Sequence, residues 1–422
     1  CALPILLVSS ALNSINSELE EMGEIQGAGK AMILRKITLP LVLPAILSAV
    51  ILTFSKAIGT FGTINYLGSP VQYYTLSSQL YMNINSRDTQ TGFAMAILMI
   101  IIASIAVFVN QKLIGSRKSY ATIGGKGGRS TLIGLGKVGR PVITAALFVF
   151  FAVGIIMPIV ILVMESFMLK EGIYSLDNFT LHYWIGESNP QIMEGLPGIF
   201  KNDEFINSLF NSLRLTLVNG VFGTIFGQLL GYITAKGRGR LHGKLVEQLV
   251  FIPYLIPSVA FGGIYLSMFS QPQQIFGVTL VPALYGTFAL LTLVSVVKHL
   301  PFAARAGTSN MLQISGELEE AATIEGAGFF RRFVKIVFPL SKGGFISGFM
   351  LIFVSIMKEL DLIILIMTPT TSTLPYLAFR YQNGNSPQAS DCVAIVMFSI
   401  VFLVYAIANL SGKADLAKSM AG

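Results

Sequence analysis

Long apolar stretches separated by short polar ones are the dominant pattern along this chain. A helix of about 20 apolar residues crosses about 30 Å of hydrocarbon. Backbone groups in lipid must satisfy one another, and no stretch alternates like a barrel strand, so the pattern predicts membrane-spanning helices. Eight stretches qualify, at about residues 41–63, 92–110, 141–165, 207–235, 247–269, 281–299, 343–367 and 392–411.

The charges between these stretches predict which side of the membrane each loop faces. Segment 111–140 has seven basic residues and no acidic one, and loop 236–246 has four basic residues. Segment 166–204 has six acidic residues and two lysines. Because Lys and Arg gather in cytoplasmic loops, we expect the first two segments inside and the third outside. Alternation then places the C-terminus in the cytoplasm.

Composition agrees with a membrane protein. Of 422 residues, 53% are hydrophobic and 12% are charged, whereas a soluble domain has about 25% charged residues. The net charge of +8 comes from basic loops, so a nucleic-acid partner is not needed to explain it. Cys1, Cys392 and three scattered histidines lack the spacing of a disulfide framework or metal site. We therefore expect no metal and no cofactor.

One charged, glycine-broken segment occurs twice. Residues 18–40 read ELEEMGEIQGAGKAMILRKITLP and residues 317–339 read ELEEAATIEGAGFFRRFVKIVFP, a shift of 299 residues without a gap. Gly326 favours a break because glycine disfavours helix and readily adopts positive φ. Each copy therefore predicts two short helices joined by a glycine elbow. An interfacial anchor would explain one copy, but two copies favour docking onto a two-fold partner.

The repeated segment resembles the EAA loop of binding-protein-dependent ABC importer permeases. In the second copy the resemblance rests on Glu320-Ala321-Ala322, Gly326 six residues after Glu320, and the ending Ile336-x-Phe338-Pro339. The first copy keeps Glu21, Gly27, Ile37 and Pro40 at the same spacing. It departs from the family at Met22-Gly23, where the family prefers two alanines.

The resemblance implies an all-α polytopic protein with a parallel internal repeat of the type I ABC importer permease fold. Residues 1–110 resemble the C-terminal part of one permease domain, which makes the first repeat N-terminally truncated. Residues 111–140 form a basic, glycine-rich cytoplasmic linker, and residues 141–422 resemble a complete six-helix domain. The fused layout is similar to ferric-iron transport permeases, with polyamine, thiamine and phosphonate importers as alternatives.

The resemblance also implies the partners. An ABC ATPase dimer in the cytoplasm would receive both loops, and an extracytoplasmic solute-binding protein would deliver the cargo through the bacterial inner membrane. The residues implied in ATPase coupling are Glu21, Gly27, Glu320, Ala321, Ala322 and Gly326. The chain itself is then not an enzyme, and GGKGGRST in the linker lacks the GxxxxGK[ST] phosphate loop.

Charged residues inside a predicted span give a second candidate site. Lys358, Glu359 and Asp361 interrupt the span 343–367, and each charge costs about 2.5–3.5 kcal/mol at the bilayer centre. They form either a local Lys358–Asp361 pair or a polar lining of the translocation path. Gly223, Gly227 and Gly231, spaced four apart, predict close helix packing.

Two other classes remain as alternatives. A secondary transporter would carry coupling-ion ligands in broken helices at the membrane midplane. A membrane enzyme would show clustered His, Asp or Cys at one membrane face, which the cysteine and histidine count disfavours.

Overall fold

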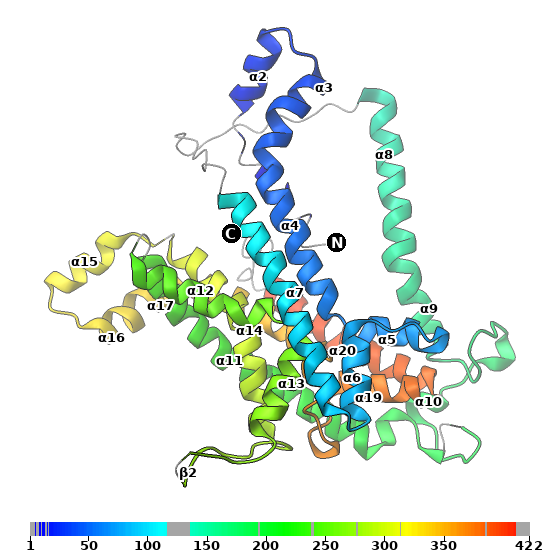
Figure 1. The fold of residues 1–422 in the computed structure, drawn as a ribbon. Helices are drawn as coiled ribbons and strands as arrows, with labels where there is room; N and C mark the ends of the chain where they lie inside the picture. The colour runs from blue at the N-terminus through cyan, green and yellow to red at the C-terminus, as the bar shows by residue number, and fades with distance from the viewer. Residues whose placement is uncertain are drawn as a thin grey trace. The chain divides into compact units, whose positions relative to one another are not determined.

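The computed structural model describes residues 17–115, 136–192, 195–237, 240–275, 277–312, 314–384 and 386–410, with a few positions before residue 17. Most of the predicted linker 111–140 therefore lies outside the described residues. The named elements of the described part are helices, apart from one antiparallel pair of strands (Figure 1).

The elements are given in three groups along the chain, one before the predicted linker and two after it. The elements of residues 17–115 are α2 (Ser17–Ile25), α3 (Lys30–Ile33), η1 (Leu34–Thr38), α4 (Leu39–Gly59), α5 (Gly62–Gly68), η2 (Ser69–Val71), α6 (Leu76–Asn85) and α7 (Thr89–Gly115). The elements of residues 136–281 are α8 (Gly136–Phe151), η3 (Ala152–Ile156), α9 (Met157–Glu165), η4 (Leu176–Asn178), α10 (His182–Ile185), η6 (Ile199–Lys201), α11 (Asp203–Lys236), α12 (Leu241–Leu255), α13 (Ser258–Phe269), β1 (Gln273–Ile275) and β2 (Val278–Val281). The elements of residues 288–410 are α14 (Phe288–Met311), α15 (Gly316–Ile324), α16 (Phe329–Arg332), η7 (Phe333–Val337), α17 (Phe338–Leu340), α18 (Lys342–Met357), η8 (Pro369–Thr371), α19 (Leu374–Asn383) and α20 (Pro387–Leu410).

Six helical stretches are long and apolar enough to cross a membrane, and two bent helix pairs raise the number to eight. The predicted all-α polytopic fold is confirmed. The span expected at 281–299 has different boundaries, because it is helical from Phe288 to Met311. Its expected start at residue 281 instead belongs to the hairpin of β1 and β2.

Two predicted spans are broken rather than continuous. In 247–269, the helices α12 and α13 meet at an angle of 98°. Ile256, which precedes Pro257, has ψ 128, because a residue before proline avoids the helical region. The carbonyls that the break leaves free are capped: Lys298 Nζ donates to the carbonyl of Pro253 at 2.9 Å and also to that of Ile256.

The span predicted at 343–367 also ends early. Helix α18 stops at Met357, and turns follow as far as residue 366. The preceding helical stretch 329–340 meets α18 at 76°. The turns are nevertheless buried, since Leu362 is 0% exposed and Ile366 is 1% exposed. The three charged residues of this span therefore lie in the loop after α18 and not along a helix; Lys358 is exposed, and Glu359 and Asp361 are half-buried.

The described chain forms two compact units, residues 1–58 with 100–158 and residues 59–99 with 159–420. The main core of the second unit gathers residues of α11, α13, α14 and α18 with the turns after α18. Glycines on α11 allow this: a Cβ on Gly227 would lie 2.3 Å from Ala303 Cβ, and one on Gly231 would lie 2.5 Å from the Gly307 carbonyl carbon. The predicted packing role of the glycine stripe is confirmed.

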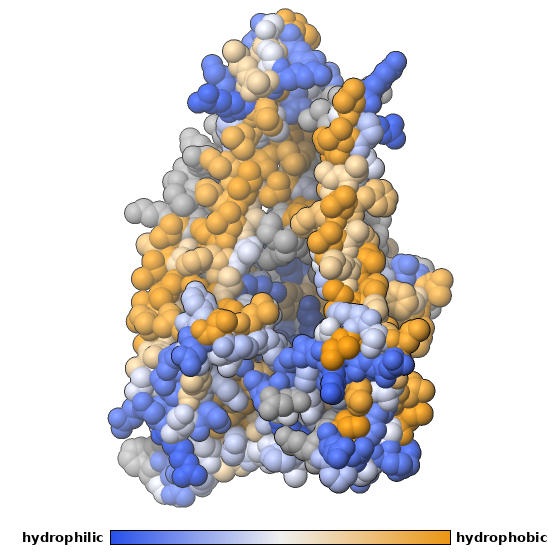
Figure 2. Space-filling model, turned by 90° about the vertical axis from the view of Figure 1, so that its right-hand side faces the viewer, coloured by the Kyte–Doolittle hydropathy of each residue, from blue (hydrophilic) through white to orange (hydrophobic). Residues whose placement is uncertain are grey.

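Apolar residues cover much of the face that Figure 2 shows. Along α8, the side chains of Val142, Leu147, Phe148 and Phe150 are each more than 60% exposed. A surface this apolar suits lipid and not water.

Adding one methyl group at the closest helix contact tests this packing. Gly231→Ala should destabilise the protein by about 1–3 kcal/mol, because backbone atoms of α14 leave no room for it. Thermal unfolding in detergent micelles measures the loss. Gly343→Ala on α18 is the control, since nothing lies within 4 Å of its Cβ position. Equal stability of both variants would contradict the close α11–α14 contact.

Candidate functional site

The two copies of the repeated segment fold into the same elbow, α2–α3 in the first and α15–α16 in the second (Figure 1). In the second copy the amides of Glu325, Gly326 and Ala327 donate to the carbonyls of Ala321, Thr323 and Ala322. In the first copy, 299 positions earlier, the amides of residues 26, 27 and 28 donate to the carbonyls of residues 22, 24 and 23. The elbow is thus built twice with the same backbone hydrogen bonds.

Glycine permits this turn. Gly27 has φ +82° and Gly326 has φ +78°, a left-handed conformation that costs an L-residue about 1–2 kcal/mol. The second arm of each elbow then passes into a π-helical turn, Leu34–Thr38 in one copy and Phe333–Val337 in the other. The predicted two short helices with a glycine elbow are confirmed in both copies.

The tip of each elbow is exposed and carries both charge and apolar surface. The residues implied in coupling lie there: Glu21, Gly27, Glu320, Ala321 and Gly326 are exposed, and Ala322 is half-buried. Ile25 and Ile324, at matching positions, are 85% and 86% exposed. An almost fully exposed isoleucine near an exposed carboxylate is typical of a surface that binds a partner, and less typical of a segment that packs against its own chain.

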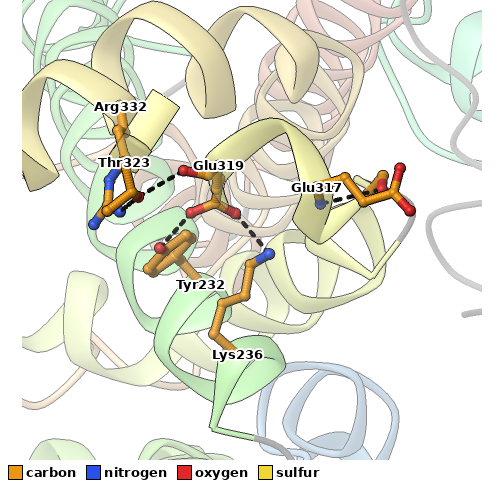
Figure 3. Close-up of polar contacts among 7 residues, drawn as sticks. Tyr232, Lys236, Glu317, Glu319, Thr323 and Arg332 are labelled. Carbon is orange, nitrogen blue, oxygen red and sulfur yellow. Dashed lines mark hydrogen bonds and ion pairs between the residues drawn. The ribbon is translucent and has the colours of Figure 1, made fainter. Parts of the chain in front are cut away.

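Glu319, the residue before Glu320, is buried, and its side chain points toward Tyr232 and Lys236 (Figure 3). Glu319 Oε2 accepts a hydrogen bond from the Tyr232 hydroxyl at 2.6 Å, and its Oε1 lies 2.6 Å from Lys236 Nζ. Tyr232 and Lys236 are one turn apart at the end of α11, so both reach one carboxylate. Sequence reasoning selected Glu320 and missed Glu319, because both lie in an ELEE run and only the tertiary fold separates them.

The two arms of the second elbow are also joined directly. Thr323 on α15 donates to the Glu319 carbonyl at 2.7 Å and accepts a hydrogen bond from Arg332 on α16. In the first elbow a different pair joins the arms, since Thr38 donates to Glu20 at 2.6 Å. Valine stands at the position of the second copy that corresponds to Thr38. The two elbows thus share a backbone but differ in the side chains that hold it.

Burial and pairing act on the Glu319 carboxyl in opposite directions. Burial raises the pKa of Glu319, but the contacts with Lys236 and Tyr232 together lower it more, so the pKa lies below its ordinary value of 4.5. The carboxylate is therefore charged at neutral pH and keeps both contacts.

The charged loop after α18 is a second candidate site. Asp361 accepts hydrogen bonds from the backbone amides of Phe61 at 3.1 Å and Gly62 at 2.9 Å. The predicted alternative of a local Lys358–Asp361 pair is wrong: Lys358 is exposed, and no ion pair between these two described residues is present. The reason is that α18 ends at Met357, so i,i+3 helical spacing does not apply.

The Asp361 contact joins corresponding loops of the two repeats. Position 62 corresponds to position 361 under the shift of 299 residues. A Cβ on Gly62 would lie 3.1 Å from Leu360 Cδ2 and 3.4 Å from the Asp361 carboxylate, so glycine allows this close approach. The phenyl ring of Phe61 is fully buried next to Tyr81 and Phe379.

Glu359 has partners of its own on α14 and within the loop. His299 Nε2 lies 3.4 Å from Glu359 Oε2, and the Leu362 amide donates to Glu359 Oε1 at 3.0 Å. Lys298, next to His299, caps the α12–α13 break. Sequence reasoning found the two acids but missed His299 and Lys298, because their partners are more than 40 residues away in the chain.

Comparison with known proteins identifies similar chains. The model of the family described as "Binding-protein-dependent transport system inner membrane component" matches residues 2–120 and 227–414. The chain is 22% identical over 425 aligned residues to the ferric transport system permease protein FbpB of Actinobacillus pleuropneumoniae. The alignment covers 99% of this chain and 58% of that protein. The chain thus spans little more than half the length of this relative.

Two further matches concern other transport systems. The sulfate transport system permease protein CysT of Synechocystis sp. is 26% identical over 212 residues, covering 48% of this chain and 71% of that protein. A chain of the crystal structure of a bacterial ABC transporter involved in the import of the acidic polysaccharide alginate matches with a TM-score of 0.51 and 16% identity. It covers 64% of this chain and 94% of that chain. At this identity the likeness shows the fold alone.

The Glu319 contacts should depend on pH. Because the folded-state pKa of Glu319 is below the unfolded value, their stabilisation is fully present above about pH 5 and is lost as the pH falls through the folded-state pKa. A spin label on Ile324→Cys, with Cys1 and Cys392 replaced, should become more mobile at low pH. In Glu319→Gln the mobility should not show this pH step, and an identical step in both proteins would contradict the assignment.

The Asp361 contact should contribute to stability. Asp361→Ala leaves the Phe61 and Gly62 amides without their acceptor, which should cost about 1–3 kcal/mol. Lys358→Ala, at an exposed neighbouring position, should change stability by less than about 0.5 kcal/mol. Thermal unfolding of both variants measures the difference, and equal midpoints would show that the Asp361 bonds contribute nothing.

Proposed function

The chain belongs to the family of binding-protein-dependent transport system inner membrane components, and we propose that it acts as the permease subunit of an ATP-driven ABC importer. In this role it forms the solute path, and a separate ATPase subunit hydrolyses ATP. We propose that residues 1–110 form the C-terminal part of a first permease domain, residues 111–140 a cytoplasmic linker and residues 141–422 a complete second permease domain.

The observation that carries this proposal is the elbow built twice. Each tip presents a carboxylate, Glu21 or Glu320, beside an isoleucine that is about 85% exposed. A partner with a basic group at the rim of an apolar cleft is complementary to such a tip. Two matched tips suit a partner with two equivalent clefts, as a dimer of ATPase subunits provides.

The proposed orientation follows from charge. The basic segment 111–140 and loop 236–246 support a cytoplasmic position for both elbows and the C-terminus, on the side where the proposed ATPase would act. The acidic segment 166–204 then faces outward, toward a solute-binding protein that delivers cargo.

Ferric iron is the proposed cargo. A ferric permease matches 99% of the chain, although at 22% identity. Sulfate is the alternative that the other relative favours, and polyamine, thiamine and phosphonate remain from the sequence resemblance. We propose that Lys358, Glu359 and Asp361 lie at the translocation path, because ionisable residues within a membrane region are by default candidates for a functional site.

The cargo can be tested together with the class of transporter. The complete importer, reconstituted in vesicles with its ATPase and its binding protein, should hydrolyse ATP faster when the binding protein carries ferric iron. Sulfate, a polyamine, thiamine and a phosphonate are the comparison arms. Stimulation by another cargo instead of ferric iron would identify that solute as the cargo and would still support the importer class. An ATPase that does not bind the permease would contradict the importer itself.

Changes at the elbow tip should uncouple transport from ATP hydrolysis. Glu320→Lys reverses the docking charge, and Gly326→Asp places a side chain at φ +78°, so each should lower transport about tenfold or more while membrane insertion persists. Glu21→Lys and Gly27→Asp should do less, because the first copy departs from the family motif.

The matched control for these variants is Glu317→Lys. Glu317 is exposed on the same helix as Glu320 but lies nearer the start of that helix, farther from the glycine elbow. Its substitution by lysine makes the same change of charge. Transport that stays normal in Glu320→Lys and Gly326→Asp would rule out the docking role of the second elbow.

A further inference from the structure

We propose that Tyr232 and Lys236 form a clamp on Glu319 that fixes the second elbow to α11, so that movement of the elbow moves this helix as well. The inference rests on the proposed function for its role in transport, but the clamp itself is a property of the chain alone. Glu319, Tyr232 and Lys236 are positioning residues here, distinct from the exposed docking residues.

The clamp uses both oxygens of one buried carboxylate (Figure 3). The Tyr232 hydroxyl takes Oε2 and the Lys236 ammonium lies at Oε1, each at 2.6 Å. The Glu319 side chain is only 9% exposed, whereas that of Lys236 is 35% exposed. The two contacts offset the cost of burying the Glu319 carboxylate. Removing one partner would leave this buried negative charge poorly solvated, which is unfavourable.

Tyr232 also holds the second arm of the elbow. Its ring centroid lies 5.7 Å from that of Phe329 and 5.8 Å from that of Phe333, both in edge-on geometry. The hydroxyl thus holds α15 while the ring packs on α16 and η7. Because one residue touches both arms, the elbow is attached to α11 as a unit and not by one arm.

Helix α11 is a suitable receiver of this motion. One turn before Tyr232, Gly227 and Gln228 pack on the backbone of α14, and Gly231 lies against Gly307. Such contacts leave no room for sliding, so α11 and α14 move together. The direct chain continuation, in contrast, passes through the 76° bend between residues 340 and 342. The clamp therefore adds a stiff connection beside a bent one.

Docking and clamping use different faces of α15. Glu319 is 7% exposed, while its neighbours Glu320 and Ala321 are exposed. A partner can thus hold the tip of the elbow without displacing the clamp. Loss of the clamp should leave docking intact and reduce the transfer of motion, and this combination separates a positioning role from a docking role.

The first test uses the permease alone, so it does not depend on the proposed function. A spin label at Ile324→Cys, in the full chain with its own cysteines replaced, reports the mobility of α15. Glu319→Gln and Lys236→Met should each raise the mobile fraction several-fold at neutral pH. Glu317→Gln, an exposed glutamate on the same helix, should not. Equal mobility in all four proteins would overturn the clamp.

The second test asks what the clamp does in the assembled importer. Glu319→Lys or Lys236→Glu alone should lower the solute transported per ATP about tenfold, the scale of one lost charged hydrogen bond. The ATPase should still co-purify with both variants. Exchanging the charges, Glu319→Lys with Lys236→Glu, should restore coupling to within about twofold of the wild type.

The outcomes separate the two proposals. Failure of the wild-type permease to bind an ATPase contradicts the proposed function and leaves the mobility result to decide the clamp. Normal coupling in both single variants overturns the clamp's role in transport. A double variant that folds and binds the ATPase but remains uncoupled shows that the Glu319–Lys236 contact is not the cause, which also overturns it.

Discussion

Where a helix breaks within a membrane-spanning region, the backbone N–H and C=O groups freed by the break need partners in the protein, because lipid supplies none. Two features of the fold answer this constraint. Lys298 caps the carbonyls at the α12–α13 break. Asp361 accepts the amides of Phe61 and Gly62 where α4 has ended. At these two breaks a charged side chain, Lys298 or Asp361, supplies the partner that the backbone needs. The elbows, whose tips are exposed, satisfy their own carbonyls through turns at glycines in the left-handed region.

The same features divide the molecule into parts with different tasks. Glycines at the α11–α14 contact make a stiff pair of helices, and the elbow is fixed to that pair through Glu319. The tip of the elbow remains exposed. The buried loop after α18 joins corresponding segments of the two repeats through Asp361. A force applied at the tip thus has a continuous route into the region where the proposed solute path lies.

The sequence predicted the apolar helical stretches, the glycine stripe and both elbows, because each is encoded locally by apolar length, small-residue spacing or a glycine break. It did not predict where spans break. Pro257 was visible, but whether a proline bends or ends a helix depends on whether Lys298, far along the chain, can cap the freed carbonyls. Glu319 and Glu320 are likewise indistinguishable in an ELEE run, and only packing against Tyr232 buries one of them. The Asp361 contact spans 300 residues, beyond the reach of any helical spacing rule.

Cross-linking at the elbow tips tests the central claim most directly. A photo-reactive residue placed at Ile25 or Ile324 of the full permease, mixed with its purified ATPase in a transport-active complex, should cross-link to the ATPase at both positions. Leu176 is the control, because it is 90% exposed and lies in the segment proposed to face outward. Cross-links at both tips and none at the control are the predicted result. An active complex that cross-links at neither tip would contradict the account.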